Sequence, residues 1–419
     1  MKQKKTGIDR RSFLKYVGAT GIMTSSLGFP NFLRGAEQDP IKIAQINPLS
    51  GPMATAGLNW QQGHELAIKQ INDAGGVKAL GGRKLTLLNG DTEGKPELGS
   101  SETERVIKAG AVAVVGFWTS AVAMVGSQVC EKYHVPCFHF SSADQVVDRG
   151  FKFCFGIIPP ISRRPAMVSE QYRWMFEVMG VKPKRAALLM VDTDYGQGTA
   201  RGLKEIWKKT GEMEVVADVS YPLQTADITS EMTKIKAARP EVVFQTGHLP
   251  DGILIARALY QLRVDVMGLL GAMSASYQEP AFISELSKLS EYIFNCTFGG
   301  LDNENPAVKE VADRFQKMFN KPYNLISQHA YNTTYIIADA LERAGSANPE
   351  ALRDAVAKTN LLLKLRPVGP VLFDEKGVDI NSKPVLLQIL DGDYRIVGPK
   401  GVERRKPVFP VPKWSQRKI

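Results

Sequence analysis

The chain has 419 residues, of which 44% are hydrophobic and 23% charged, so it is long enough to form two compact domains. Its formal charge of +10 lies at the ends: residues 1–39 carry a net +4 and residues 400–419 a net +6, which leaves the body neutral. A neutral body lacks the basic surface that binds a phosphate backbone, so we expect no nucleic-acid partner.

Residues 1–36 have the composition of an export signal. Three lysines open the segment, Arg10-Arg11 precedes Phe13-Leu14-Lys15, and a weakly apolar stretch follows that is too short for a membrane span. This pattern predicts a twin-arginine signal read by the twin-arginine export machinery, and hence a soluble periplasmic protein. The alternative is a basic leader with a chance arginine pair.

Short apolar runs then alternate with helical periodicity from residue 41 to residue 140. The predicted strands are 41–46, 84–88, 112–116 and 136–140, and the predicted helices are 58–74, 96–109 and 120–133. The third strand contains only apolar residues and glycine, as is typical of a strand covered on both faces. Repeated strand–helix–strand units predict a parallel sheet flanked by helices.

The same pattern restarts after Pro159-Pro160, which predicts a second, similar α/β lobe. Its strands are expected at 186–191, 215–219, 242–245 and 266–270, between helices near 164–179, 196–209, 227–238 and 250–262. Later helices are expected near 306–319, 326–344 and 349–358, and strands at 370–373 and 385–390. These late elements must complete sheets begun earlier, so we expect the chain to cross between the lobes more than once.

Enzymatic and metal-binding signatures are absent from the sequence. The chain has no nucleophile elbow, zinc-protease motif or P-loop, so we expect no enzymatic activity, no cofactor and no metal site. Ser120 and His248 are the one candidate nucleophile–base pair for an exported enzyme. The four cysteines lack zinc-motif spacing, and both a disulfide among Cys130, Cys137 and Cys154 and buried free thiols stay open.

Polar turns follow five of the predicted strands at their carboxyl ends, where open α/β sheets bind ligands. Thr119 or Ser120 can cap the helix that follows the strand at 112–116, and the free amides of a helix start bind carboxylates. Each turn alone is more often a cap or a packing site. All five turns lie at the same edge of the predicted sheets, and this coincidence predicts a binding cleft. The cleft would be formed by Thr119, Ser120, Ser141, Ser142, Ala143, Tyr195, His248 and Met273.

Several motifs in order along the chain resemble one family. They are residues 49–52 (LSGP), 71–77 (INDAGGV), 115–121 (VGFWTSA), 194–198 (DYGQG) and 369–374 (GPVLFD). From about residue 41 to residue 398 the chain is similar to the periplasmic branched-chain amino-acid binding proteins, the receptors of a class of ABC importers.

The resemblance implies a type I periplasmic binding protein fold, in which two lobes joined by three crossovers close on a small molecule. Lobe 1 would comprise residues 41–160 plus 297–378, and lobe 2 residues 161–296 plus 379–412, with a basic tail at 413–419. The implied partners are a small-molecule ligand and an ABC permease in the inner membrane, and the implied state is a monomer.

The family's binding site carries over residue by residue. Trp118 would line the pocket, Ser120 and the amides of Ser141 and Ala143 would hold a carboxylate, and Tyr195 and His248 would close from lobe 2. The remaining candidates are Trp60 as a wall near the mouth, Thr119, Ser142 and Met273.

One position departs from the family pattern. Amino-acid binders carry an acidic residue in the loop after the strand that is here 266–270, whereas this chain has Gly271-Ala272-Met273-Ser274. A buried ammonium group without a partner costs several kcal/mol. We therefore expect a small carboxylate-bearing ligand, either an organic or aromatic acid or an amino-acid-like molecule, with an amide or urea-like ligand as the alternative. A sensory receptor with the same fold is the alternative function. Asp144 or Glu279 nearby could restore ammonium binding.

Overall fold

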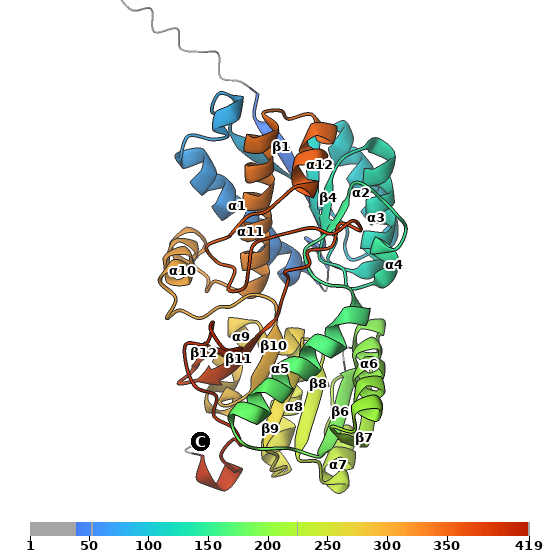
Figure 1. Ribbon diagram of the computed structural model, residues 1–419, viewed down its shortest axis with the longest axis vertical. Coiled ribbons are helices and arrows are strands. Elements are labelled where there is room, and N and C mark those ends of the chain that lie inside the picture. The colour runs from blue at the N-terminus through green and yellow to red at the C-terminus, as the bar shows by residue number, and fades with distance from the viewer. Residues whose placement is uncertain (1–38, 52, 224, 418–419) are drawn as a thin grey trace, which may run out of the picture. The chain divides into compact units, whose positions relative to one another are not determined.

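The computed structural model describes residues 39–51, 53–223 and 225–417, so the predicted signal in residues 1–36 lies outside the described part. The strands of this part form two sheets (Figure 1). The first half supplies β1 (Ile41–Asn47), α1 (Ala54–Asp73), β2 (Leu85–Asp91), α2 (Pro96–Lys108), β3 (Ala111–Gly116), α3 (Ser120–Tyr133), β4 (Cys137–His139), α4 (Asp144–Val147) and β5 (Cys154–Gly156).

The first sheet is wholly parallel and has the strand order β2-β1-β3-β4-β5. Alternate residues of its strands face opposite sides, as pleating requires. Ile41 and Ile43 of β1 pack with residues of α1 and α11 (Leu325–Ala344). Ala44 and Ile46 pack with residues of α2 and α3 on the other face.

The second sheet has seven strands in the order β12-β11-β10-β9-β8-β6-β7. Its elements are α5 (Arg164–Val178), β6 (Arg185–Val191), α6 (Asp194–Thr210), β7 (Glu214–Tyr221), α7 (Thr229–Ala238), β8 (Val242–Thr246), α8 (Leu249–Gln261), β9 (Gly268–Ala272), α9 (Pro280–Leu286), β10 (Phe294–Thr297), β11 (Val385–Leu390) and β12 (Asp393–Gly398). The pairings β10–β11 and β11–β12 are antiparallel, and the others are parallel.

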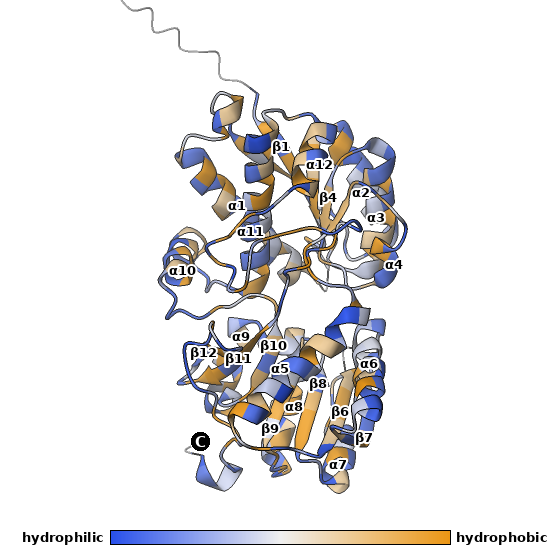
Figure 2. Cartoon of the chain, in the orientation of Figure 1, coloured by the Kyte–Doolittle hydropathy of each residue, from blue (hydrophilic) through white to orange (hydrophobic). Residues whose placement is uncertain are grey.

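Helices cover both faces of the second sheet. Along β6, Leu188 and Met190 share a core with α5 and α6, whereas Leu189 and Val191 share one with α7, α8 and α9. Figure 2 shows the hydrophobic colour concentrated on the central strands β8 and β9. Because both faces of these strands are buried, their sequences are apolar runs, and these runs allowed the strands to be predicted.

The chain passes between the two sheets three times: after β5, after β10, and before β11. Between the second and third passage, α10 (Pro306–Phe319), α11 and α12 (Pro349–Ala357) form, and α11 and α12 join the core of the first sheet. A buried ion pair between Arg366 and Asp379 holds the last passage. The expected fold class, two α/β lobes with a three-segment connection, is thereby confirmed.

The structure corrects some of the predicted elements. The segment 370–373 is not a strand, because only isolated bridges join Val371 to Leu361 and Phe373 to Asp379. The strand expected at 266–270 is β9, two residues later, so that Met273 follows it directly. The sequence analysis missed α4, β5, α9, β10 and β12.

Two open points about the chain's chemistry are also settled. All four cysteines are buried free thiols and none forms a disulfide. The basic tail packs against the body through Trp414, which is only 8% exposed and whose indole nitrogen donates to the carbonyl of Val264 at 2.9 Å. Among the described helices, none has the length and apolar character to cross a membrane.

Candidate functional site

A cavity of about 340 Å³ lies where the carboxyl ends of strands from both sheets meet. The first sheet contributes the turn after β3 and the turn after β4. The second contributes the turns after β6, β8 and β9. The lining residues are Met53, Trp118, Thr119, Ser120, Phe140, Ser142, Ile158, Arg164, Thr193, Asp194, Tyr195, Leu223, His248, Met273, Ala275, Gln278, Thr297, Phe298 and His329.

A stack of aromatic rings forms the wall from the first sheet. The rings of Trp118 and Phe140 are stacked with centroids 5.6 Å apart and an interplanar angle of 5°. Phe140 also contacts His329 of α11, at 4.6 Å between centroids. Trp60 packs edge-on against Phe140 at 5.5 Å and is fully buried there. The wall is therefore flat and apolar, which suits a planar or aliphatic ligand body.

The start of α3 is the polar part of this wall. Thr119 is the N-cap, and its hydroxyl accepts a hydrogen bond from the Val122 amide at 3.4 Å. Ser141 donates to the hydroxyl of Ser120 at 3.1 Å and accepts from the Ala143 amide at 3.2 Å. The amide of Ala143 already has a partner in this structure, so the first turn of α3 is the stronger candidate for holding an acidic group.

A buried polar network fixes the opposite wall. The hydroxyl of Ser274 donates to Gln245 at 2.7 Å and accepts from the Gly247 amide at 3.1 Å. Asn295 donates to the Ser274 carbonyl at 2.9 Å and accepts from its amide at 3.1 Å. These bonds hold the loop after β8 and the loop after β9 in register, and those loops carry His248 and Met273.

Tyr195 presents its ring rather than a free hydroxyl to the cavity. Its hydroxyl donates to the Met273 carbonyl and accepts from the Ala275 amide at 3.2 Å. Burial raises the pKa of Tyr195 to about 12, so the phenol stays protonated at neutral pH. The ring of His248 lies beside that of Tyr195, with centroids 6.0 Å apart.

Arg164 supplies the positive charge of the cavity. Burial lowers the pKa of His329 to about 3 and also lowers the pKa of His248, so both imidazoles are neutral at pH 7. Burial lowers the pKa of Arg164 only to about 10, which leaves it protonated. Asp194 is the carboxylate among the lining residues, and it is exposed in the first turn of α6.

The structure brings most of the predicted site residues together. Seven of the ten line the cavity: Trp118, Thr119, Ser120, Ser142, Tyr195, His248 and Met273. Trp60 does not reach it and lies behind Phe140, while Ser141 and Ala143 support the start of α3 from outside the lining. The pair Ser120 and His248 shares the cavity, but no hydrogen bond joins the two side chains in the described part of the chain.

Sequence analysis missed Phe140, Arg164, Phe298 and His329. Phe140 is the last residue of a predicted strand and precedes Ser141, a predicted site residue, so the sequence already indicated that Phe140 lies at the site. Arg164 follows the Pro159-Pro160 break, and nothing in its sequence context indicates that it is buried. His329 comes from a helix almost 190 residues after Phe140, and only the folded topology places the two rings together.

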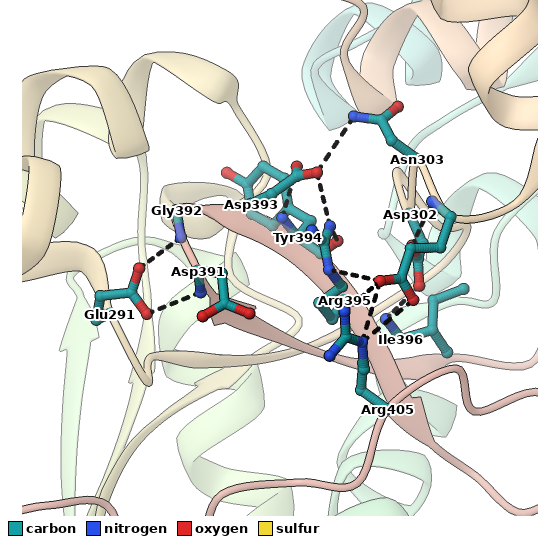
Figure 3. A network of polar contacts seen from close by, with 11 residues as sticks. Glu291, Asp302, Asn303, Asp391, Gly392, Asp393, Tyr394, Arg395, Ile396 and Arg405 are labelled. Atoms are coloured by element: carbon teal, nitrogen blue, oxygen red, sulfur yellow. Dashed lines mark hydrogen bonds and ion pairs between the residues drawn. The ribbon is translucent and has the colours of Figure 1, made fainter.

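A larger hollow, of about 790 Å³, lies away from the strand carboxyl ends, between α9, α10 and β12. Its arginine, Arg395, is already paired with Asp393 at 2.6 Å and Glu304 at 3.5 Å (Figure 3). Within residues 39–417, apart from the two undescribed positions, no group of three or more His, Cys, Asp or Glu side chains is arranged to hold a metal ion. The strand-end cavity is therefore the candidate binding site.

Comparisons with known proteins agree with this geometry. The sequence profile of the family described as "Periplasmic binding protein" matches residues 40–392. A Leu/Ile/Val-binding protein homolog from Brucella melitensis biotype 1 is 29% identical over 85% of this chain and 93% of its own. The leucine-, isoleucine-, valine-, threonine- and alanine-binding protein of Pseudomonas aeruginosa is 27% identical over 84% and 89%.

Solved structures show the same fold. The branched-chain amino acid transporter substrate-binding protein of Streptococcus pneumoniae, in complex with isoleucine, has a TM-score of 0.72 at 21% identity and covers 85% of this chain and 98% of its own. A solute-binding protein of an ABC transporter from R. palustris, in complex with benzoate, has a TM-score of 0.69 at 17% identity, over 86% and 96%. These relatives are binding proteins and not enzymes. The chain belongs to the periplasmic binding protein family.

Proposed function

We propose that the chain is the extracytoplasmic receptor of an ABC importer, which captures a small carboxylate-bearing solute and delivers it to a permease in the inner membrane. The observation that carries the proposal is the cavity of about 340 Å³ between the carboxyl ends of two sheets. Its volume is in the range of small-molecule sites, and a ligand that touches both walls favours a closed arrangement of the lobes.

The proposed lobes are residues 41–160 plus 297–378 and residues 161–296 plus 379–412. The three passages between the sheets would act as the hinge, because they are the covalent links between two separately packed cores. We propose a monomer, because the three passages that would form the hinge all lie in one chain.

The chemistry of the cavity favours an acid with an apolar body. The start of α3 can accept a carboxylate, and the stacked pair of Trp118 and Phe140 offers a flat surface beside it. The loop after β9 carries no carboxylate for an ammonium group, and neither Asp144 nor Glu279 lines the cavity. The lining carboxylate, Asp194, is exposed in the first turn of α6. A neighbouring structure contains benzoate, which has this chemistry, whereas the Pseudomonas aeruginosa relative is named for binding leucine, isoleucine, valine, threonine and alanine.

A ligand panel tests the proposal. We expect isothermal titration calorimetry to detect benzoate or phenylacetate at micromolar affinity, with leucine, isoleucine, acetamide and urea much weaker. Small-angle scattering should then show a smaller radius of gyration with the bound acid than without it. Tight binding of leucine alone would contradict the choice of ligand, and the absence of binding and closure across the panel would contradict the function.

A further inference from the structure

Arg164 is the one lysine or arginine among the described residues that is fully buried, with 6% of its surface exposed. It is the first residue of α5 and lines the cavity. Its Nε donates to the Pro159 carbonyl at 2.8 Å, whereas the buried Nη2 has no hydrogen-bond partner. Asp144 is near enough to affect the pKa of Arg164, but no described carboxylate lies within ion-pair distance of the guanidinium.

Two other arginines whose side chains are mostly buried, Arg366 and Arg395, are paired with carboxylates. Arg366 forms its ion pair with Asp379, and Arg395 lies among the carboxylates of Asp393 and Glu304 (Figure 3). Arg149 also lacks a carboxylate partner among the described residues and donates to the Met124 carbonyl and the Ser127 hydroxyl, but it lies outside the cavity lining. Arg164 combines the missing partner with a place in the lining of the ligand cavity.

An unpaired buried guanidinium is costly. Arginine cannot release its proton at neutral pH, so the loss of hydration is not relieved by neutralisation. A carboxylate in the cavity would supply the missing counter-charge, and a guanidinium group can bind it in the forked geometry that such groups favour. Arg164 is therefore suited to bind an acidic group of the ligand from the side of the second sheet.

The start of α3 lies on the other wall and can hold an acidic group of its own. We infer that the ligand is a diacid, with one carboxylate on Arg164, the other at the first turn of α3, and an apolar body against Trp118 and Phe140. The inference rests on the proposed function and narrows its ligand class. Such a ligand would bridge both walls by charge, which couples binding to closure.

Matched probes test the inference by calorimetry on the purified protein. Terephthalate and its monoamide, 4-carbamoylbenzoate, have the same shape and differ in one charge. The wild type should bind terephthalate at least ~30-fold more tightly, as expected for a partly buried charge pair. In Arg164→Met this preference should fall to about threefold or less, and Arg164→Lys should restore only part of it because the fork is lost.

Thermal unfolding separates a binding role from a structural one. Without ligand, Arg164→Met should melt at the same or a higher temperature than the wild type, because it removes an unpaired buried charge. The control Arg395→Met should melt lower and keep the diacid preference. Equal affinities of the wild type for the two probes, or an Arg164→Met protein that is destabilised and keeps its preference, would overturn the inference and leave the proposed function standing. Failure of benzoate and both probes to bind would count against both.

Discussion

At the scale of single residues, burial decides which groups in the cavity carry charge. His248 and His329 line the site beside aromatic rings, and the resulting loss of hydration lowers the pKa of each imidazole below its usual value. Arg164 is buried as well, yet it keeps its proton because its pKa stays near 10. A cation that does not titrate near neutrality gives the receptor a constant affinity over the pH range of its surroundings.

This assignment predicts that the affinity for terephthalate changes little between pH 6 and pH 8.5. Both carboxylates of the probe are ionised over that range, Arg164 is protonated and His329 is neutral, while burial lowers the pKa of His248 and so favours its neutral form. If a histidine supplied the charge, binding would instead strengthen as the pH falls through its pKa, by up to about tenfold per unit. Calorimetry in buffers of matched ionic strength distinguishes the two cases.

At the scale of elements, close contact between α1 and α11 ties the early and late parts of the first lobe together. Gly63 of α1 lies against α11, and a Cβ atom there would be 2.3 Å from the Ser327 carbonyl and 2.8 Å from the Ala330 Cβ. The hydroxyl of Ser327 also donates to the Asn59 carbonyl at 2.8 Å. α11 carries His329 into the cavity, so this contact helps to position the aromatic wall.

Replacing Gly63 with alanine should therefore destabilise the protein by ~1–3 kcal/mol, the usual range for overpacking, although the same change in an exposed helix is stabilising. Urea unfolding measures the difference. Gly198→Ala in α6 is the matched control, because its nearest obstacle is a side-chain carbon of Ile161 at 2.9 Å, which can shift. A Gly63→Ala protein as stable as that control would show that the two helices can move apart.

At the scale of the whole molecule, the third passage between the sheets is fixed by buried charge. Asp379, only 2% exposed, pairs with Arg366 and also accepts hydrogen bonds from the amides of Leu372 and Asn381. Its own amide donates to the Gly156 carbonyl at 3.0 Å, beside the first passage. Two of the three connections are thus joined to each other at this point.

Asp379→Asn should cost roughly 3–5 kcal/mol, since it leaves Arg366 buried without its counter-charge. Denaturant unfolding followed by tryptophan fluorescence would measure the loss. Asp148→Asn breaks the exposed pair with Lys376 and should change stability by less than about 1 kcal/mol. Equal stability of the two variants would show that the ion pair between Arg366 and Asp379 does not hold the third passage in place.

The repeated strand–helix pattern was enough to predict the two-lobed fold, because its strands are covered on both faces and read as apolar runs. The missed strand β10 shows the limit of that signal. Its Asn295 and Thr297 are polar yet buried, and Asn295 is satisfied by Ser274, which only the folded sheet reveals. The sequence does contain a signal for β12, because Asp391-Gly392 is typical of a two-residue hairpin turn. In the structure it lies between two strands, and both residues have positive φ.

The candidate site was likewise predictable only in part from the sequence. The polar turns could be predicted because the ends of parallel strands meet at one edge, and seven of the ten named residues do line the cavity. The family resemblance implied that Trp60 forms a wall near the mouth, but its indole packs behind Phe140. The role of Arg164 depends on its burial, and that of His329 depends on contacts between distant parts of the chain. Neither can be predicted from the local sequence.

The four free thiols bear on where the protein can mature. Burial raises the pKa values of Cys137 and Cys296, and the hydrogen bond with the Cys137 thiol, followed by burial, raises the pKa of Cys154. These sulfurs are therefore neither exposed nor ionised. Because the described residues contain no disulfide, folding of this part of the chain requires neither an oxidant nor a disulfide isomerase. A protein that matures in this way could be translocated as a finished globule, the route that the arginine pair at its start predicts.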